Sequence, residues 1–462
     1  MSALTLSAVM ACTPVATAAT AQAVAPPLAE SLASPRLLSL RELLDSVREH
    51  HPAVQAARAR VRAARGSRTA AGVFGNPTLT FDVENAPLPG GVTPPMDREA
   101  MTTIMVPLEP LYQRRARVRR ADADVRAAEA DAIVARQRVA LAAARAYYRT
   151  ALSQVGVDVA RDLAGWLDTV VAYNRLRVRE GVSAEADLLR SELERDRTTA
   201  EASMQEADLV RARAELAAFL GEVDLQSLRV RVDDAPVALP SMFKGGQEDR
   251  IVASASRGRD LATPDAVTHA LAERPQLRAA RERVTSASAG VASERTMLFR
   301  QAGAMVGTKQ SGGTTSLIAG VSVPLPLFDQ NRGEVARATA EREAAALDLV
   351  AEERSARAEI VGAYEAARLL TDRAAALAAK RSDGSSVYLT RADEARRIAL
   401  GAYREGAVPL LSVIDAARAW GEARVAYYRT LFAQHESVLA LLAAQGADLA
   451  TALSAPSTGA PR

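Results

Sequence analysis

The sequence is poor in the residues that carry most catalytic and metal chemistry. Its 462 residues include one cysteine, Cys12, and four histidines, and only 4% of the residues are aromatic. A single sulfur excludes an intramolecular disulfide and any metal or redox site that needs a second thiolate. The low aromatic content, combined with long segments of Ala, Arg, Glu and Leu, is typical of long packed helices rather than compact cores.

The four histidines do not form a metal-binding pattern. His50 and His51 are adjacent, so on a helix their side chains diverge by about 100°, unlike two ligands on one face. His269 and His435 are isolated in the sequence. No glycine-rich phosphate loop follows a predicted strand, and no nucleophile–base pairing is suggested. We therefore expect no enzymatic activity, no cofactor and no bound metal.

Charge is abundant but balanced, with 58 Lys+Arg against 55 Asp+Glu, and bases and acids are interleaved along the predicted helices. This argues against nucleic acid as a partner, because nucleic-acid-binding proteins usually have a basic face with a net excess. The local exception is the run from Arg114 to Arg120, which contains five arginines. We interpret it as a solvated or phospholipid-facing helix start.

The N-terminal residues resemble a secretory signal peptide. The apolar run from Leu4 to Ala11 precedes small residues that end in Ala21-Gln22-Ala23, which fits an A-x-A cleavage site. We predict a signal peptide at 1–23 and a linker at 24–36, although the basic n-region is missing and the true start codon stays open. Val9-Met10-Ala11-Cys12 is an imperfect lipoprotein box, so lipidation of Cys12 is the alternative to its removal.

The rest of the chain repeats one plan in the same order, which predicts a duplicated unit of helix, apolar hairpin and long helix pair. The offset grows by eight residues between the second and third landmarks, close to the heptad that a long coiled helix tolerates best. The three landmarks are Pro52 with Pro275 (offset 223), Pro107 with Pro324 (offset 217) and Gly181 with Gly406 (offset 225).

These landmarks divide the chain into domains. The first repeat is predicted at 37–221, with a β-hairpin at about 76–109 and a helical hairpin at about 112–221. A linker at 222–263 leads to the second repeat at 264–450, with a β-hairpin at about 298–327 and a helical hairpin at about 331–450. Residues 451–462 are predicted to be a disordered tail.

Alternating apolar and polar residues predict the two β-hairpins. In the first, Leu79, Phe81 and Val83 alternate with polar residues, and a Pro/Gly-rich loop at 87–95 leads to a strand at 101–106. In the second, a strand at 300–307 is followed by Gly312-Gly313 and a strand at 317–323 with its apolar residues on one face. A half-buried hairpin of a soluble protein is the alternative interpretation.

No segment beyond the N-terminus approaches the ~18–20 apolar residues of a membrane-spanning helix. If the chain enters a bilayer, it must do so through strands closed into a barrel, because lipid offers exposed backbone groups no other partner. A wet face opposite an apolar face suits such a wall. Four strands cannot close a barrel with a lumen, so we expect a cyclic homotrimer to pool its strands.

The helices form the bulk of the molecule. Residues 114–179 contain no proline and could form one rod near 100 Å long at ~1.5 Å per residue. The second equivalent, about 333–405, is expected to be similar, with Gly362, Gly384 and Gly401 as soft points. The returning helix of the first repeat carries small and apolar residues at three- and four-residue steps, a coiled-coil seam. These residues are Leu189, Leu193, Ala200, Ala207, Val210, Ala214 and Ala217.

With these features, the chain resembles the outer membrane efflux proteins of the TolC type over about residues 37–450. The resemblance rests on the duplicated plan, the Pro-rich strand ends at 106–108 and 323–333, and the two Arg-Glu-Gly turns. The run from Val323 to Gly333 is especially similar to the cobalt-zinc-cadmium (CzcC-like) branch that serves heavy-metal efflux pumps.

The resemblance implies a mainly α fold with a small β part. It implies a homotrimer with a β-barrel in outer-membrane lipid and an α-helical barrel crossing the periplasm. Such a passive duct works with a periplasmic adaptor and an inner-membrane RND pump, here one for heavy-metal cations. The same duct serving a drug or organic-compound pump is one alternative, and a periplasmic coiled-coil adaptor or scaffold is another.

The resemblance also assigns residues at the periplasmic tips. Asp187 and Asp415 match acidic residues of the constriction, and Tyr403 matches a gate aromatic. Carboxylates from three subunits that converge on an axis would attract cations. The sequence departs from the family at Ser412, where a second acid is expected, and at Val408, where a basic partner is expected. The implied adaptor-contact residues are Gly181, Val182, Ser183, Gly406, Ala407 and Val408.

Two of these assignments have simpler alternatives. Asp187 could equally stabilise a helix N-terminus as a first-turn carboxylate. Gly181 and Gly406 are explained most simply as turn residues that need a positive φ.

Overall fold

A computed structural model describes residues 37–86, 97–221, 224–232, 235–237, 264–297 and 302–452. The predicted signal peptide with Cys12, the predicted linker at 24–36, the 87–95 loop and most of the inter-repeat linker lie outside the described residues, as do residues 453–462 of the predicted tail. Among the described helices, none is both long and apolar enough to cross a membrane.

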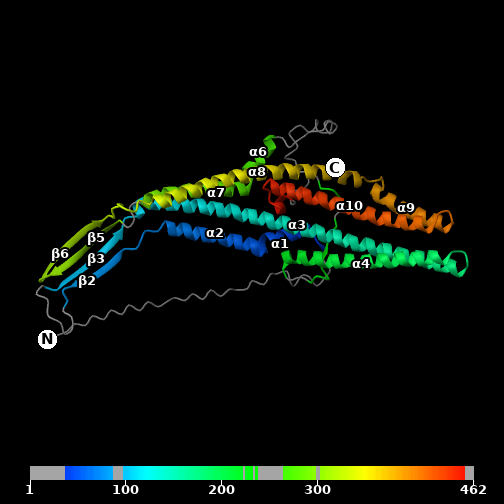
Figure 1. The fold of residues 1–462 in the computed structure, drawn as a ribbon, viewed down its shortest axis with the longest axis horizontal. Helices are drawn as coiled ribbons and strands as arrows, with labels where there is room; N and C mark the ends of the chain where they lie inside the picture. The colour runs from blue at the N-terminus through cyan, green and yellow to red at the C-terminus, as the bar shows by residue number, and fades with distance from the viewer. Residues whose placement is uncertain are drawn as a thin grey trace.

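The described elements form an elongated molecule with a small β-sheet at one end and two helical hairpins at the other (Figure 1). In the first repeat these are β1 (Leu37–Leu38), α1 (Leu40–His50), α2 (Pro52–Ala71), β2 (Thr78–Glu84), β3 (Glu99–Pro107), α3 (Pro110–Arg179), α4 (Glu185–Leu220) and β4 (Arg229–Val230). In the second they are α6 (Pro264–Glu273), α7 (Pro275–Thr296), β5 (Gly303–Ser311), β6 (Thr314–Ser322), α8 (Arg332–Leu377), α9 (Val387–Arg404), α10 (Leu410–Ala444) and α11 (Leu449–Ala452).

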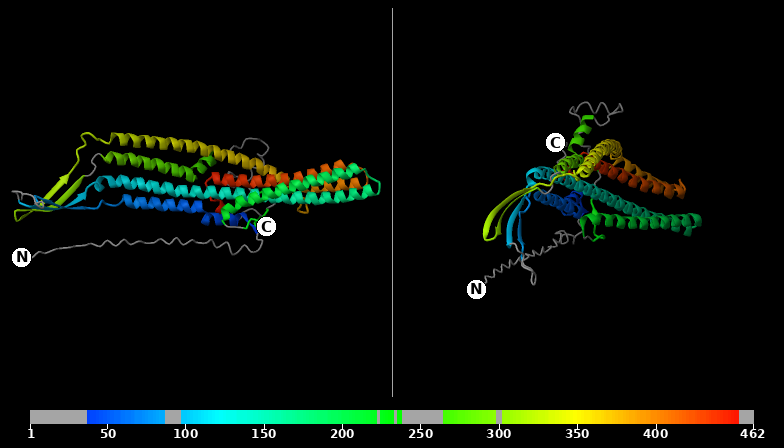
Figure 2. Two further views of the ribbon diagram at one scale, coloured as in Figure 1. Left: turned by 60° about the horizontal axis from the view of Figure 1, so that its bottom comes forward. Right: turned by 60° about the vertical axis from the view of Figure 1, so that its left-hand side comes forward.

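The duplication is confirmed in space. Pro52 and Pro275 each occupy the first turn of a helix, where the missing amide costs no hydrogen bond. Both repeats then pass through a hairpin into a long helix and a returning helix (Figures 1 and 2). α3 is one 70-residue helix, about 105 Å long at 1.5 Å per residue, as the proline-free run predicts.

The second long helix is not one rod, and that prediction is wrong. It is divided into α8 and α9 by residues 378–386. Gly384 has a φ of +83°, and the Asp383 carboxylate accepts hydrogen bonds from the Ser385 amide (2.9 Å) and hydroxyl (2.6 Å). Ser386 then caps α9. The eight residues added to the second repeat therefore do not lengthen the helix by a heptad. Five of them lie between Pro324 and the start of α8, and the other three lie within the interrupted stretch of α8 and α9.

The coiled-coil seam predicted on α4 does not pack inside the chain. Leu189, Leu193 and Val210 are exposed. The buried face of α4 combines polar and apolar residues. The polar ones are Ser191, Glu194 and Thr198, and the apolar ones are Ala202, Leu209, Ala212 and Leu216. The predicted seam is thus an outer stripe of the single chain.

The two hairpins join into one antiparallel sheet of order β2-β3-β5-β6. The strand bounds differ from the predicted ones by a few residues, and the β5–β6 turn uses Gly312 (φ +55°) and Gly313 (φ +81°), as expected for a two-residue hairpin. Four helices continue the strands as one layer, in the same order as the sheet: α2, α3, α7 and α8. In this layer α2 packs against α3, α3 against α7, and α7 against α8.

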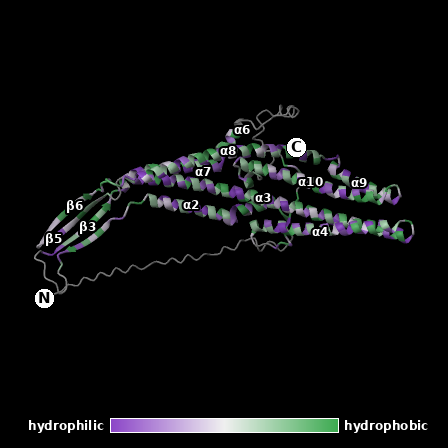
Figure 3. Ribbon diagram, in the orientation of Figure 1, coloured by the Kyte–Doolittle hydropathy of each residue, from purple (hydrophilic) through white to green (hydrophobic). Residues whose placement is uncertain are grey.

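Pairing across the sheet sorts its residues into two faces, because directly opposed residues point the same way. Leu79 pairs with Ile104, which pairs with Val306. The opposite face is mixed: it contains Asp82, Glu99 and Lys309, with Glu99 and Lys309 in an ion pair, together with several methionines and Ile318. Apolar and polar residues alternate along the strands (Figure 3). Seven apolar side chains on the first face are 42–77% exposed: Leu79, Phe81, Ile104, Val106, Val306, Leu317 and Val321.

The main core lies in the middle of the molecule, where α1, α3, α4 and α10 meet. Leu43, Leu216 and Phe432 are buried there. The Tyr147 hydroxyl donates to the carbonyl of Arg231 (2.7 Å), beside the parallel pair β1–β4. This core leaves the two hairpins free to extend away from it.

Candidate functional site

The two hairpin turns lie together at the end opposite the sheet (Figure 1). α3 and α9 end in the same capping motif: Gly181 donates to Val178 and Val182 to Arg177, while Gly406 donates to Tyr403 and Ala407 to Ala402. This Schellman motif needs a left-handed residue, supplied by Gly181 (φ +73°) and Gly406 (φ +80°). The glycines therefore do have the turn role expected from sequence.

The predicted contact residues are divided between surface and packing. Val182 and Ala407 are exposed beside their glycines, whereas Ser183 and Val408 are half-buried. Val408 packs against the apolar cluster beneath the second tip, which includes Val170, Leu410 and Val413. An apolar residue here, where the family pattern expects a basic one, is thus accommodated by the core of the tip.

Tyr403 is only 4% exposed and joins the two hairpins. Its hydroxyl donates to Asn174 Oδ1 on α3 (2.6 Å), and its ring meets the edge of Tyr173 at 5.9 Å between centroids. The Arg177 guanidinium lies over both tyrosine rings. Burial raises the pKa of Tyr403, Arg177 opposes this, and the Asp187 carboxylate adds to the increase.

The structure therefore brings Asp187 into the electrostatic environment of Tyr403. Asp187 is half-buried in the first turn of α4, where its carboxylate accepts a hydrogen bond from Ser183 (3.3 Å). This geometry fits the helix-terminus role. Asp415 is exposed on α10, and the group on which it acts electrostatically is Arg418, one turn further along.

An ion pair that the sequence analysis missed connects the hairpins below the tips. Glu194 of α4 is 8% exposed and accepts hydrogen bonds from Arg418 of α10 (2.6 and 2.9 Å) and from Arg197 (3.0 Å). Burial raises the pKa of Glu194, but the bonds from Arg418 and Arg197 outweigh it and the net shift is downward.

A second missed contact uses both tryptophans of the chain. The Arg396 guanidinium on α9 lies 3.8 Å from the centroid of the Trp420 ring and 5.7 Å from that of Trp166. Trp420 also donates to Asp393 (2.5 Å). Desolvation lowers the pKa of Arg396. The rarity of tryptophan in so long a chain was a signal that could have pointed to this junction.

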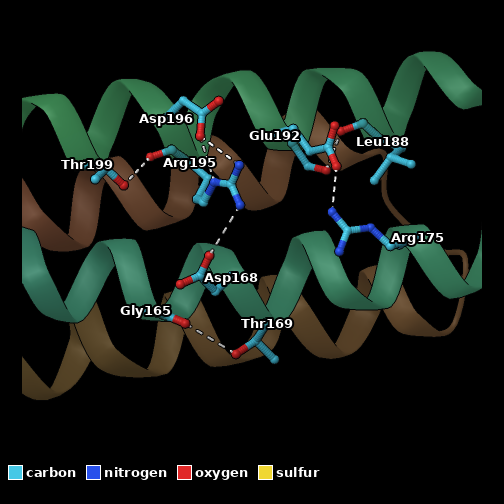
Figure 4. Close-up of polar contacts among 10 residues, drawn as sticks. Gly165, Asp168, Thr169, Arg175, Leu188, Glu192, Arg195, Asp196 and Thr199 are labelled. Carbon is cyan, nitrogen blue, oxygen red and sulfur yellow. Dashed lines mark hydrogen bonds and ion pairs between the residues drawn. The ribbon is translucent and has the colours of Figure 1, made fainter.

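Exposed ion pairs hold α3 and α4 together as a unit (Figure 4). Near the tip, Arg175 pairs with Glu192 (2.7 Å), and Arg195 lies 3.7 Å from Asp168. Each such pair stabilises the hairpin by only a few tenths of a kcal/mol. Among the described residues, no group of three or more His, Cys, Asp or Glu side chains is placed to hold a metal ion.

A comparison with protein families matches residues 43–222 and 266–447 to the model of the outer membrane efflux protein family. The two matched segments cover most of the chain and correspond to its two repeats. The chain belongs to the outer membrane efflux protein family. No curated protein matches the chain significantly.

Solved structures support the same fold. The outer-membrane channel OprN is 21% identical with a TM-score of 0.69, and the match covers 89% of this chain and 90% of that one. The CmeC outer membrane channel of Campylobacter jejuni is 15% identical with a TM-score of 0.70, covering 88% and 85%. The MtrE outer membrane channel of Neisseria gonorrhoeae is 19% identical with a TM-score of 0.66, covering 89% of both chains.

Proposed function

We propose that the chain is the outer-membrane channel of a tripartite efflux system, a passive exit duct across the outer membrane and periplasm. The observation that carries this proposal is the exposed apolar face of the sheet, which water would not solvate favourably. The outer strands β2 and β6 each pair on one side only among the described strands, and three copies side by side would pair their free edges in a closed wall.

A homotrimer would also give the α4 stripe a partner. Leu189, Leu193 and Val210 remain exposed in one chain, and rods of this length gain most of their stability from packing. The tips at Gly181 and Gly406 would then meet a periplasmic adaptor, which connects the duct to an inner-membrane RND pump. Family membership favours this role over the adaptor or scaffold considered from the sequence.

The transported substrate is proposed to be a heavy-metal cation. The support is the similarity of the run from Val323 to Gly333 to the CzcC-like branch. A duct for drugs or other organic compounds is the second candidate, because the described residues offer no selective set of ligands that would distinguish the two.

Cell fractionation combined with a deletion strain tests both levels of this proposal. We expect recovery of the chain from the outer membrane as a detergent-stable trimer that conducts in planar bilayers. Deletion should increase sensitivity to Co²⁺, Zn²⁺ and Cd²⁺, and the plasmid-borne gene should restore resistance. Sensitivity to dyes and antibiotics alone would favour the organic-compound duct. A stable, water-soluble monomer without detergent would refute the channel.

The gate is proposed to include Asp187, Tyr403 and Asp415, with Asp415 on the exposed side of α10. Replacing Asp415 by Ala removes three exposed carboxylates from a trimer. We expect reduced cation selectivity in planar bilayers, because a ring of carboxylates attracts cations. Glu422→Ala on the same helix is a matched loss of charge further from the tip. Unchanged selectivity in Asp415→Ala would remove Asp415 from the gate.

A further inference from the structure

A groove of about 510 Å³ lies between α3 and α7, just beyond the sheet. Its lining includes Tyr112, Arg115 and Arg119 from α3, and Ser288 and Thr296 from α7. Arg115 and Arg119 belong to the arginine-rich run from Arg114 to Arg120 noted in the sequence. Neither the proposed gate nor the sheet explains that run.

Two arginines of the groove are not neutralised. Asp122 is paired with Arg68 at 2.9 Å, and Arg126 with Glu282 at 2.9 Å, so these charges cancel. Arg115 and Arg119 are exposed, and no ion pair with either is formed in the described part of the chain. Since they lie four residues apart, they project from the same side of α3.

The hand of the strands shows which way the sheet faces. Leu108 follows Ile104 and Val106 at steps of two residues, so all three belong to the set whose side chains lie on the apolar face. The amide of Leu108 donates to the carbonyl of Ala302, next to β5 (2.8 Å). In a strand of L-residues that runs upward with a side chain toward the viewer, the amide of that residue points to the right. Seen from the apolar face, β5 and α7 thus lie to the right of β3 and α3.

The hand of α3 then places the groove. Asp124 and Asp131 point toward α7, where they contact Ser286 (2.5 Å) and Arg283 (2.6 Å). Counted from them at 100° per residue in a right-handed helix, Tyr112, Ala116 and Arg119 turn toward the viewer. Arg115 begins on the side of α3 away from α7, and its long side chain still lines the groove. The same count along α7, starting from Ser286 and Arg283, places its groove-lining residues on the viewer's side as well. The groove therefore opens on the apolar side of the sheet.

Its depth matches a headgroup layer. α3 begins at residue 110, so Arg115 and Arg119 lie about 8 and 14 Å along its axis. The polar layer on each side of a bilayer is roughly 5–8 Å thick, and an arginine side chain can extend several ångströms toward it. Leu111, 75% exposed, is an apolar residue between the sheet and these charges.

We propose that this groove binds the phosphate of an anionic phospholipid of the phosphatidylglycerol type in the periplasmic leaflet. Guanidinium groups recognise phosphate with two parallel hydrogen bonds. The Ser288 and Thr296 hydroxyls donate to the carbonyls of Val284 (2.8 Å) and Ser293 (2.7 Å), and their oxygens can accept hydrogen bonds from a glycerol headgroup. The inference rests on the proposed outer-membrane location. It adds a fixed lipid contact that sets the height of the channel in the membrane.

The test uses the full-length wild-type trimer and the double variant Arg115→Gln/Arg119→Gln in nanodiscs of phosphatidylcholine with or without phosphatidylglycerol. Lipid that stays bound after transfer to detergent is measured by native mass spectrometry. Two arginines near an anionic surface should strengthen binding roughly ten- to thirtyfold. The wild type should therefore retain phosphatidylglycerol and the double variant should lose it, while phosphatidylcholine retention stays the same.

Arg190→Gln/Arg397→Gln is the matched control, because it removes two exposed arginines near the tips and should retain phosphatidylglycerol like the wild type. Equal retention by wild type and groove variant would overturn the inference, as would equal loss in the control. Displacement of the lipid by inorganic phosphate at matched concentration would also overturn it, since the groove would then bind phosphate as such. Absence of the wild type from the outer membrane would instead refute the proposed function.

Discussion

Replacing Gly307 by Ala should abolish assembly of the channel in the membrane. Gly307 lies in β5 opposite Thr103 of β3. An added Cβ would overlap the Thr102 carbonyl oxygen and would lie 2.7 Å from Thr103 Cγ2 and 2.8 Å from Thr103 Cα. Two of these three atoms belong to the backbone, so a change of rotamer cannot relieve the overlap, and β3 and β5 must separate.

Separation at this position is costly because, among the described strands, β3–β5 is the pairing that joins the two hairpins. Overpacking in a well-packed core costs about 1–3 kcal/mol, and we expect about 3 kcal/mol or more here because ladder hydrogen bonds are also lost. The measurement is the amount of heat-modifiable trimer in the outer membrane, which should fall to near zero.

Gly320→Ala in β6 is the matched control. Its Cβ would meet only the flexible side chain of Met305, at 3.3 Å from Cγ, which can move aside. We expect a normal yield of trimer from this variant. Wild-type levels of trimer from Gly307→Ala would show that β3 and β5 do not approach as closely as the structure places them.

The sheet was largely predictable from the sequence. Alternation around Leu79 and Phe81 gave the apolar face, and Gly312-Gly313 marked the turn, because both signals are local in the chain. The pairing of β3 with β5 could not be predicted in the same way. It joins residues about 200 positions apart, and only the layer of α2, α3, α7 and α8 sets their order.

The helices show why the rest could not be predicted. The periodic stripe with Leu189 and Leu193 predicted a buried seam, but periodicity does not distinguish packing within a chain from packing between copies. Glu194 is buried instead because Arg418, over 200 residues away, neutralises it. The break at Gly384 was visible as a soft point, yet eight extra residues favoured a longer helix equally well until the Asp383 turn was seen.

At the tips, sequence and family resemblance proposed residues for a gate but could not predict their contacts. Tyr403 was expected before the turn, and its buried bond to Asn174 depends on how α9 packs on α3. Arg396 between two tryptophans is likewise a tertiary arrangement. Such contacts join residues from different helices, so no spacing within one helix predicts them.

Replacing Arg418 by Glu should release α10 from α4 and increase conductance. The variant removes two hydrogen bonds to Glu194 and places a second carboxylate beside it. Breaking a fully buried ion pair costs about 3–5 kcal/mol. We expect about 2 kcal/mol, because the Arg418 side chain is 41% exposed and Arg197 still contacts Glu194. That is a shift of roughly thirtyfold toward separated hairpins.

The pH dependence gives an independent measurement. Because the pKa of Glu194 is lowered in the folded chain, its ion pair stabilises the packing of α4 against α10 above the ordinary glutamate pKa of 4.5. This contribution is lost as the pH falls through the lowered value. Wild-type conductance should therefore rise only in acid, below pH 4.5, whereas Arg418→Glu should already be high at neutral pH.

The charge-swapped variant Glu194→Arg/Arg418→Glu is the control that separates the ion pair from general damage. It restores opposite charges between α4 and α10, although Arg197 then faces a like charge, so recovery should be partial. Conductance at neutral pH should return most of the way to the wild-type value. If Arg418→Glu and the swapped variant conduct like the wild type, the contact between α4 and α10 does not limit opening, and the gate must depend on Tyr403 and the residues at the turns.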